Sequence, residues 1–281
     1  MVKGFQGRDF LRLVSSSSSP SLARTTSEQA QVAIEIRDAT LNYPLGAFAR
    51  ASLKTSLLGL LGHRAKEHKT TFVSALRGVN LDFKLGERVA LIGHNGSGKS
   101  TLLRSLAGIY PLDGGSITVV GRIGTLLDVG LGFEPEATGR ENIYHRGLTM
   151  GYSRSQLKQV EERIIDFAEL GEFIDLPVRI YSAGMFVRLG FAISTEFSPE
   201  ILLVDEVFGA GDAAFAKRAL DRMMAIVARA GILVIATHDL PLIEKVCKRV
   251  IWLERGQVVR DGAPLDVLPE YVRVMAGQGS V

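Results

Sequence analysis

The stretch LIGHNGSGKSTLLRSLAG, residues 91–108, places a glycine-rich turn between an apolar run and a leucine-rich segment. Residues 93–100 within it match the pattern G-x-x-x-x-G-K-[ST]. Glycines let the backbone wrap a phosphate closely with its N–H groups pointing inward, and a following helix adds positive potential. We expect a phosphate-binding loop made of Gly93, His94, Asn95, Gly96, Ser97, Gly98, Lys99, Ser100 and Thr101.

Within this loop, two side chains have separate expected tasks. Lys99 should reach the β- and γ-phosphates of a nucleotide, and Ser100 should bind Mg²⁺ through its hydroxyl. The plainer interpretation is a glycine-rich turn that happens to match the pattern. The apolar run before it and the helix after it favour the phosphate site.

Acidic residues and a histidine end two other apolar runs. ILLVDE delivers Asp205 and Glu206, and ILVIATHD delivers His238. Ligands bind α/β sheets at the carboxyl ends of the strands. We therefore expect Asp205 to hold Mg²⁺, Glu206 to polarise an attacking water and His238 to hydrogen-bond the γ-phosphate. Solvated acids and a structural histidine are the alternatives for these positions taken singly.

The surrounding pattern predicts a mainly parallel α/β core that is interrupted after its first helix by a small β region and a helical insert. Helices are expected over 155–174, after Gly184 and over 213–230, and a hairpin over 249–262 turns at Arg255-Gly256. Strands are expected at 32–43, 79–85, 88–93, 200–206 and 231–239.

Composition narrows the class of protein further. The formal net charge of +3 over 281 residues does not favour a nucleic-acid partner. No apolar run approaches the ~18–20 residues that span a bilayer, and the single cysteine, Cys247, excludes an internal disulfide. Residues 1–31 are serine-rich and predict a disordered tail.

The stretch YSAGM, residues 181–185, narrows the choice among phosphate-loop proteins. Ser182 can cap a helix there, and Gly184 would let a phosphate approach the exposed N–H groups. The stretch resembles the L-S-G-G-Q signature of ATP-binding cassette (ABC) proteins, from which Tyr181, Ala183 and Met185 depart. Loop, signature, acid pair and histidine also follow one another in the order of that family.

The resemblance covers residues 32–262, with a helical insert at about 137–198, and leaves 263–281 as a short helix and tail. It implies an ATPase that binds ATP and Mg²⁺ as a head-to-tail homodimer. Tyr43 would stack on adenine, although a plain turn tyrosine is the alternative. Asp212 of GAGD would sense the other cassette.

By the same resemblance, Ser182 and Gly184 would face the ATP that the opposite subunit holds. The family normally carries a glutamine that binds Mg²⁺ in the loop entering the insert, and this sequence has none in GLGFEPEATGRENI. Glu136 takes its place by position, with Glu134 as the alternative.

Three loop sequences resemble those of the ATPase subunits of bacterial polysaccharide exporters: LLDVGLGFEPEATGRENIY, YSAGM and GAGDAAF. Those relatives move O-antigen, capsule or teichoic acid chains. The resemblance implies a separate multi-helix membrane permease that handles a lipid-linked glycan, and a peripheral position on the cytoplasmic face of the inner membrane.

Two points stay open at this stage. The basic, leucine-rich segment 46–70 fits either a contact with the membrane or permease or a helix that covers the β region. A non-transport cassette and a poorly hydrolysing regulatory cassette are the rival functions. The chain has no long coiled-coil insertion and no second cassette, which disfavours the first, and the intact Lys99, Asp205, Glu206 and His238 disfavour the second.

Overall fold

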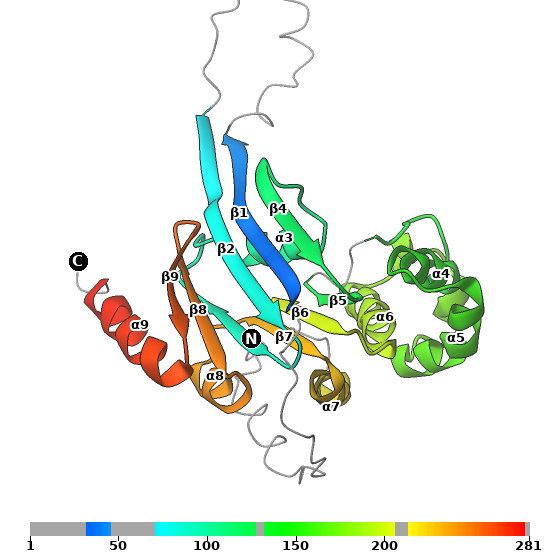
Figure 1. The fold of residues 1–281 in the computed structure, drawn as a ribbon. Coiled ribbons are helices and arrows are strands. Elements are labelled where there is room, and N and C mark those ends of the chain that lie inside the picture. The colour runs from blue at the N-terminus through cyan, green and yellow to red at the C-terminus, as the bar shows by residue number, and fades with distance from the viewer. Residues whose placement is uncertain (1–31, 46–70, 128–131, 206–212, 279–281) are drawn as a thin grey trace, which may run out of the picture.

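A computed structural model describes residues 32–45, 71–127, 132–205 and 213–278 (Figure 1). The predictions for the 1–31 tail and for the 46–70 segment therefore lie outside the described residues.

Glu206 and Asp212 also lie outside the described residues, so their predicted roles are not placed by the structure. The strand that leads to them and the helix that follows them are both described.

The core is a six-stranded sheet with the strand order β5-β6-β7-β3-β8-β9. All neighbouring pairs are parallel except the β8–β9 hairpin, which turns at residues 255–256 as predicted. The sheet confirms the predicted mainly parallel α/β class. Its strands are β3 (Arg88–Ile92), β5 (Ile123–Leu126), β6 (Ile201–Asp205), β7 (Ile232–Ala236), β8 (Arg249–Glu254) and β9 (Gln257–Gly262).

Two hydrophobic clusters cover the two faces of this sheet. On β3, Ala90 and Ile92 belong to one cluster, whereas Val89 and Leu91 belong to the other, because successive side chains of a strand point to opposite faces. One face packs on α7 (Ala213–Arg229), α8 (Leu240–Val246) and α9 (Pro264–Gln278), and the other packs on α3 (Lys99–Leu106) and a second sheet. A strand covered on both faces has to be largely apolar, as the central strands β3, β6 and β7 are.

The second sheet is antiparallel with the order β2-β1-β4, and it lies beside α3 (Figure 1). Its strands are β1 (Val32–Leu45), β2 (Thr71–Lys84) and β4 (Gly114–Val119). The sequence placed the start of β2 at residue 79, and this boundary is wrong. The strand begins at Thr71 because it pairs with β1 along nearly its whole length, from Leu45↔Thr71 to Val32↔Lys84.

A helical insert projects from one side of the core (Figure 1). It consists of α4 (Gly139–Thr149), α5 (Arg154–Ala168), two 3₁₀ turns at Gly171–Asp175 and Val178–Ile180, and α6 (Ala183–Glu196). Hydrophobic periodicity did not predict α4, because its buried face is made largely of glycine, asparagine and arginine. The start of α4 is instead fixed by a capping box between Thr138 and Glu141.

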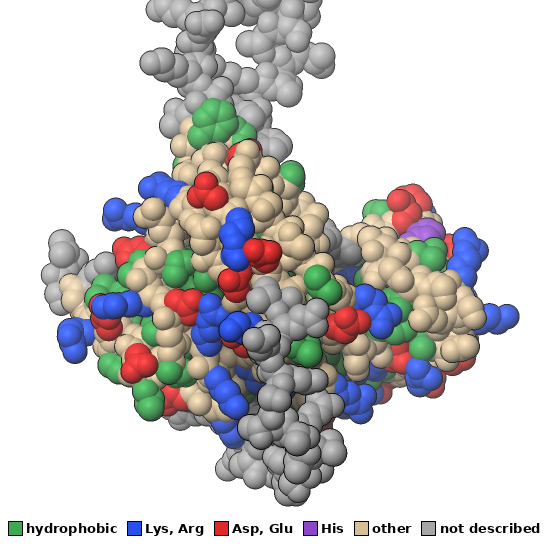
Figure 2. All heavy atoms as spheres, in the orientation of Figure 1, with side chains coloured by type: hydrophobic (Ala, Val, Ile, Leu, Met, Phe, Trp, Pro, Cys, Tyr) green, Lys and Arg blue, Asp and Glu red, His purple; other side chains and the backbone are tan. Residues whose placement is uncertain are grey.

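The surface seen in Figure 2 carries acidic and basic side chains interspersed, with no broad field of one sign. Within the described ranges, no helix is both long and apolar enough to cross a membrane.

Candidate functional site

The loop between β3 and α3 depends on glycine at three positions. Gly93, Gly96 and Gly98 have φ angles of 141°, 82° and 109°, a region that other residues rarely adopt. A Cβ on Gly93 would overlap the carbonyl oxygen of Leu253, and one on Gly98 would lie 2.6 Å from the carbonyl oxygen of Ala75. The glycines therefore provide both the loop conformation and its close approach to neighbouring strands.

Hydrogen bonds from the β8–β9 turn hold this loop from behind. The amide of Gly256 donates to the carbonyl oxygen of Ser97 at 2.9 Å, and the carbonyl oxygen of Gly256 accepts from the amide of Arg77 on β2 at 2.9 Å. Within the loop, the amide of Ser97 donates to the carbonyl oxygen of His94 at 3.1 Å. The loop is thus preformed by contacts with both sheets.

A third contact reaches the loop from the C-terminal helix α9. Burial raises the pKa of the Tyr271 hydroxyl, and the nearby amide of Gly93 partly offsets that rise. The Tyr271 ring packs edge-to-face on Trp252, with the ring centroids 5.4 Å apart, and Trp252 pairs in register with Ile92 immediately before the loop. Tyr271 was not predicted as part of the site.

Lys99 opens α3 and folds back over the loop. Its Nζ donates to the carbonyl oxygens of Gly93 at 2.6 Å and His94 at 3.1 Å, and the residue is only 8% exposed. The N-cap residue of α3, Gly98, gives no side-chain hydrogen bond to the first turn. The helix therefore begins with backbone N–H groups and a lysine at the place where an anion would bind.

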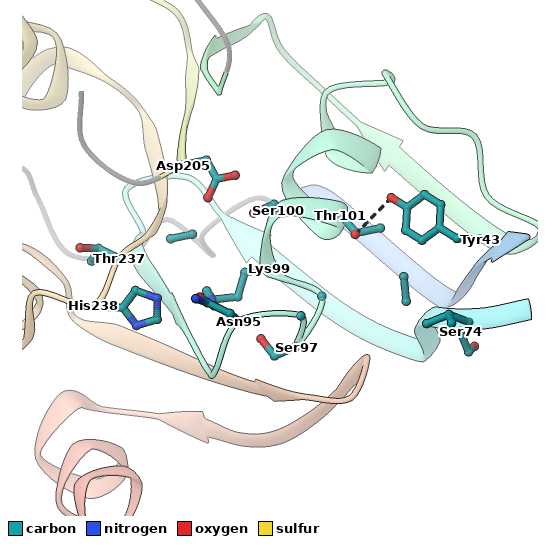
Figure 3. Close-up of a pocket in the computed structure, with 15 residues that line it drawn as sticks. Tyr43, Ser74, Asn95, Ser97, Lys99, Ser100, Thr101, Asp205, Thr237 and His238 are labelled. Atoms are coloured by element: carbon teal, nitrogen blue, oxygen red, sulfur yellow. Dashed lines mark hydrogen bonds between the residues drawn. The ribbon is translucent and has the colours of Figure 1, made fainter. Parts of the chain in front are cut away.

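These groups line a cavity of about 300 Å³ (Figure 3). Asp205 at the end of β6 and His238 just after β7 face the loop across it, because β6 and β7 are parallel and pair Asp205 with Ala236. The Ser97 hydroxyl oxygen is buried and has no hydrogen-bond partner among the described residues. Predicted residues that line the cavity are Tyr43, Asn95, Gly96, Ser97, Gly98, Lys99, Ser100, Thr101, Asp205 and His238.

Tyr43 reaches the far end of the cavity from β1 (Figure 3). Its hydroxyl oxygen lies 3.3 Å from that of Thr101, and its ring meets the Tyr110 ring edge-on at a centroid distance of 6.0 Å. Arg104 in turn lies over the Tyr110 ring at 5.8 Å. With 38% of its surface exposed, Tyr43 has an accessible ring surface at which a planar base could stack.

The predicted signature residues lie in the helical insert and do not line this cavity. The Ser182 side chain caps α6 by accepting from the amide of Met185 at 3.2 Å. Among the described residues, a Cβ on Gly184 would have only the Ser182 hydroxyl within 4 Å, so space is open beside this helix N-terminus. The structure thus separates Ser182 and Gly184 from the loop of the same chain.

Glu136 is likewise not brought to the cavity. Its carboxylate is 73% exposed and pairs with Arg179 at 3.0 Å. The alternative, Glu134, has its backbone held by the buried Asn142, whose side chain bonds both the amide and the carbonyl of Glu134 at 2.7 and 3.0 Å. A metal-binding role for Glu136 stays a prediction.

Sequence reasoning missed the side of the cavity that β2 provides. Val73, Ser74 and Ala75 line it, as does Thr237 beside His238. Thr237 could have been found from its place at the end of an apolar strand, next to His238. The β2 residues carry no such signal, because they enter the site only through pairing of β2 with β1.

A glycine-rich loop before a helix N-terminus, with a carboxylate from a parallel strand facing it, defines a P-loop nucleotide-binding site. The model of the family described as ABC transporter matches residues 76–209. The O-antigen export system ATP-binding protein RfbE of Yersinia enterocolitica is 43% identical over 83% of this chain and 98% of its own length. The chain belongs to the ABC transporter family of ATP-binding proteins, and it is an ATPase.

Other relatives agree with this assignment. The O-antigen export ATP-binding protein RfbB of Myxococcus xanthus is 43% identical over 78% of this chain, which spans half of that protein. The teichoic acids export ATP-binding protein TagH of Enterococcus faecalis is 37% identical over 73% of this chain and 46% of its own length. A dimeric ATP-binding cassette solved with ADP and phosphate has the same fold, with a TM-score of 0.59, 21% identity and coverage of 82% of this chain and 98% of that one.

Proposed function

We propose that this chain is the ATP-hydrolysing subunit of a polysaccharide exporter of the O-antigen or capsule type. The observation that carries the proposal is that Tyr43, Lys99, Asp205 and His238, from four separate segments, line one cavity. Relatives named as O-antigen and teichoic acid export proteins support the choice of substrate class.

Hydrolysis in this site needs few groups. Lys99 leaves the carbonyl oxygens of Gly93 and His94 to meet the β- and γ-phosphates, and the first amides of α3 bind the same oxygens. Glu206 orients a water for in-line attack on the γ-phosphorus, and His238, which lines the cavity, hydrogen-bonds the γ-phosphate. The bond to the leaving ADP oxygen then breaks.

Mg²⁺ fits the donor set in the cavity. The Ser100 hydroxyl and the Asp205 carboxylate both line it, and oxygen ligands of this kind are those that Mg²⁺ prefers. When bound, the ion would neutralise charge on the phosphates. Glu136, paired with Arg179 in this structure, would have to leave that ion pair to join the two ligands.

A second copy would complete each site. Ser182 and the N-terminus of α6 lie outside their own chain's cavity and are open to another molecule. In a head-to-tail dimer they would bind the γ-phosphate held by the partner's loop, and Asp212 would sense the partner. Closure of the dimer around two ATP molecules would then move the membrane partner.

Transport also requires a membrane permease, which would handle the lipid-linked glycan while this chain sits on the cytoplasmic face of the inner membrane. The proposal is tested in the organism that carries the gene. Cells that lack the chain should accumulate lipid-linked glycan and lose surface polysaccharide, and the wild-type chain should restore export whereas Lys99→Ala should not. Normal surface polysaccharide without the chain would refute the proposal.

A further inference from the structure

Helices α5, α6 and α7 meet at one corner of the molecule, where the helical insert joins the core. Each contributes one phenylalanine: Phe167 on α5, Phe191 on α6 and Phe215 on α7. The ring centroids lie 5.6–6.1 Å apart, and Phe191 and Phe215 are fully buried. The signature helix α6 is therefore packed directly against α7.

Two arginines lie beside the Phe215 ring. The guanidinium of Arg188 on α6 lies 5.1 Å from the centroid of the Phe215 ring, and that of Arg218 on α7 lies 5.6 Å from it. Each cation gains from the ring face, but two like charges beside one buried ring repel each other. A negative charge between the two guanidinium groups would offset this repulsion.

Glu169 supplies that charge. One of its carboxylate oxygens lies 2.6 Å from Arg218 and the other lies 3.7 Å from Arg188. The residue is the C-cap of α5 with φ 50° and ψ 49°, a left-handed conformation in which helices usually place glycine. A glutamate at this position costs backbone free energy, and a half-exposed ion pair returns little stability. Glu169 therefore adds little to the stability of the fold, and we expect its role to be functional.

Glu169 pairs with one arginine of α6 and one of α7, and each of these helices follows a residue with a proposed role in ATP hydrolysis. Arg188 is six residues after Ser182, and Arg218 is six residues after Asp212. At the other end of α6, Glu196 pairs with Arg222 of α7 and, at 2.7 Å, with Arg163 of α5. The ion pairs therefore fix α6 against α7 at two points along its length.

We propose that Glu169 is a positioning residue for ATP hydrolysis: by pairing with Arg188 and Arg218 it keeps the signature helix α6 in register with α7. This inference rests on the proposed function, since the register matters only if Ser182 must reach a nucleotide while Glu206 orients water. Glu169 does not line the nucleotide cavity, so it acts through the helices.

The test compares purified full-length Glu169→Gly with wild type. Glycine accepts the left-handed backbone, so the melting temperature should stay equal or rise, and the Kd for ATP should stay within twofold. The kcat of ATP hydrolysis should fall at least fivefold. Glu162→Gln, which alters an exposed carboxylate on the same helix, should change none of these.

Removing one of the two arginine charges should restore part of the kcat that Glu169→Gly loses. The double variant Glu169→Gly/Arg218→Gln should recover at least half of the lost kcat. An unchanged kcat in Glu169→Gly, or no recovery in the double variant, would overturn the proposal. Hydrogen–deuterium exchange of α6 and α7 should also speed up in Glu169→Gly, and unchanged exchange would count against it. An inactive wild type with faster exchange in the variant would instead refute only the proposed function.

Discussion

The hydroxyl oxygens of Tyr43 and Thr101 lie 3.3 Å apart, which ties the aromatic ring at the end of β1 to the first turn of α3. The aromatic end of the cavity is therefore in direct contact with the helix that follows the glycine-rich loop. If the ring stacks on adenine, its face matters more than its hydroxyl. We expect Tyr43→Ala to weaken ATP binding by roughly 1–3 kcal/mol, the worth of one stacked base.

Tyr43→Phe is the matched control, because it keeps the ring and removes only the contact with Thr101. Its Kd for ATP, measured by calorimetry, should stay close to that of wild type. Equal losses in both variants would show that the hydroxyl, and not the ring, is what binds.

Lys99→Ala should abolish hydrolysis while the domain stays folded. The ammonium group is the only side-chain donor to the carbonyl oxygens of Gly93 and His94 that the described residues show, and it would move to the phosphates. Removing a single such donor typically costs ~10²–10³-fold in kcat. Phosphate release reports the activity, and circular dichroism with a melting curve reports the fold. Wild-type activity in a folded variant would contradict the assignment.

Glu206→Gln separates binding from hydrolysis. The amide keeps the shape of the carboxylate but cannot act as a base, so hydrolysis should fall by about 10²–10⁴-fold while ATP still binds. The uncleaved ATP should join two copies through Ser182 and Gly184, and light scattering with ATP against ADP measures this. Adding Ser182→Arg should abolish the ATP-dependent dimer. A variant that hydrolyses ATP at the wild-type rate would remove Glu206 from the mechanism.

The only tryptophan of the chain, Trp252, is positioned to report on the loop. It packs on Tyr271, whose hydroxyl lies near the amide of Gly93, so ATP binding should change the fluorescence of Trp252. Tyr271→Phe, which removes this hydroxyl, should reduce that change in fluorescence and weaken ATP binding by no more than about 0.5–1.5 kcal/mol, the net worth of one hydrogen bond. Tyr144→Phe removes a hydrogen bond to Glu161 in the helical insert. It should alter neither the change in Trp252 fluorescence nor the affinity for ATP.

Burial raises the pKa of the Cys247 thiol to about 12. In the unfolded chain the thiol ionises near its ordinary pKa of about 8.5, so above that pH the unfolded state releases a proton that the folded state keeps. The free energy of unfolding should therefore fall by up to about 1.4 kcal/mol per pH unit from this group as the pH rises. Cys247→Ala should be less stable at neutral pH but should show a shallower decline between pH 9 and 11, as measured in urea.

Much of the site could be predicted because each of its residues belongs to a short motif that can be recognised in the sequence. Lys99 and Ser100 follow the glycines of one loop, and Asp205 and His238 each end a buried strand, so strand order alone brings them to the same edge. Parallel strands have no other edge at which such residues could meet.

The remainder depends on contacts between distant segments, for which a sequence pattern gives no signal. Tyr271 reaches Gly93 only because α9 packs on β8, and Ser74 reaches the cavity only because β2 extends along β1. Glu169 lies inside the predicted helix 155–174, whereas α5 ends just before it at Ala168, and nothing in its sequence neighbourhood indicates that Arg188 and Arg218 would flank it. Helix α4 was missed because capping, and not an apolar stripe, defines it.

The position of Lys99 also bears on the kinetics of nucleotide exchange. Its charge is buried against two carbonyl oxygens, so it projects little positive field into solution. Exposed charges mainly set how fast partners meet, whereas buried ones mainly set how long they stay together. Lys99 should therefore act after the nucleotide has arrived: the association rate should depend weakly on ionic strength, and the lysine should instead lengthen the lifetime of the bound state.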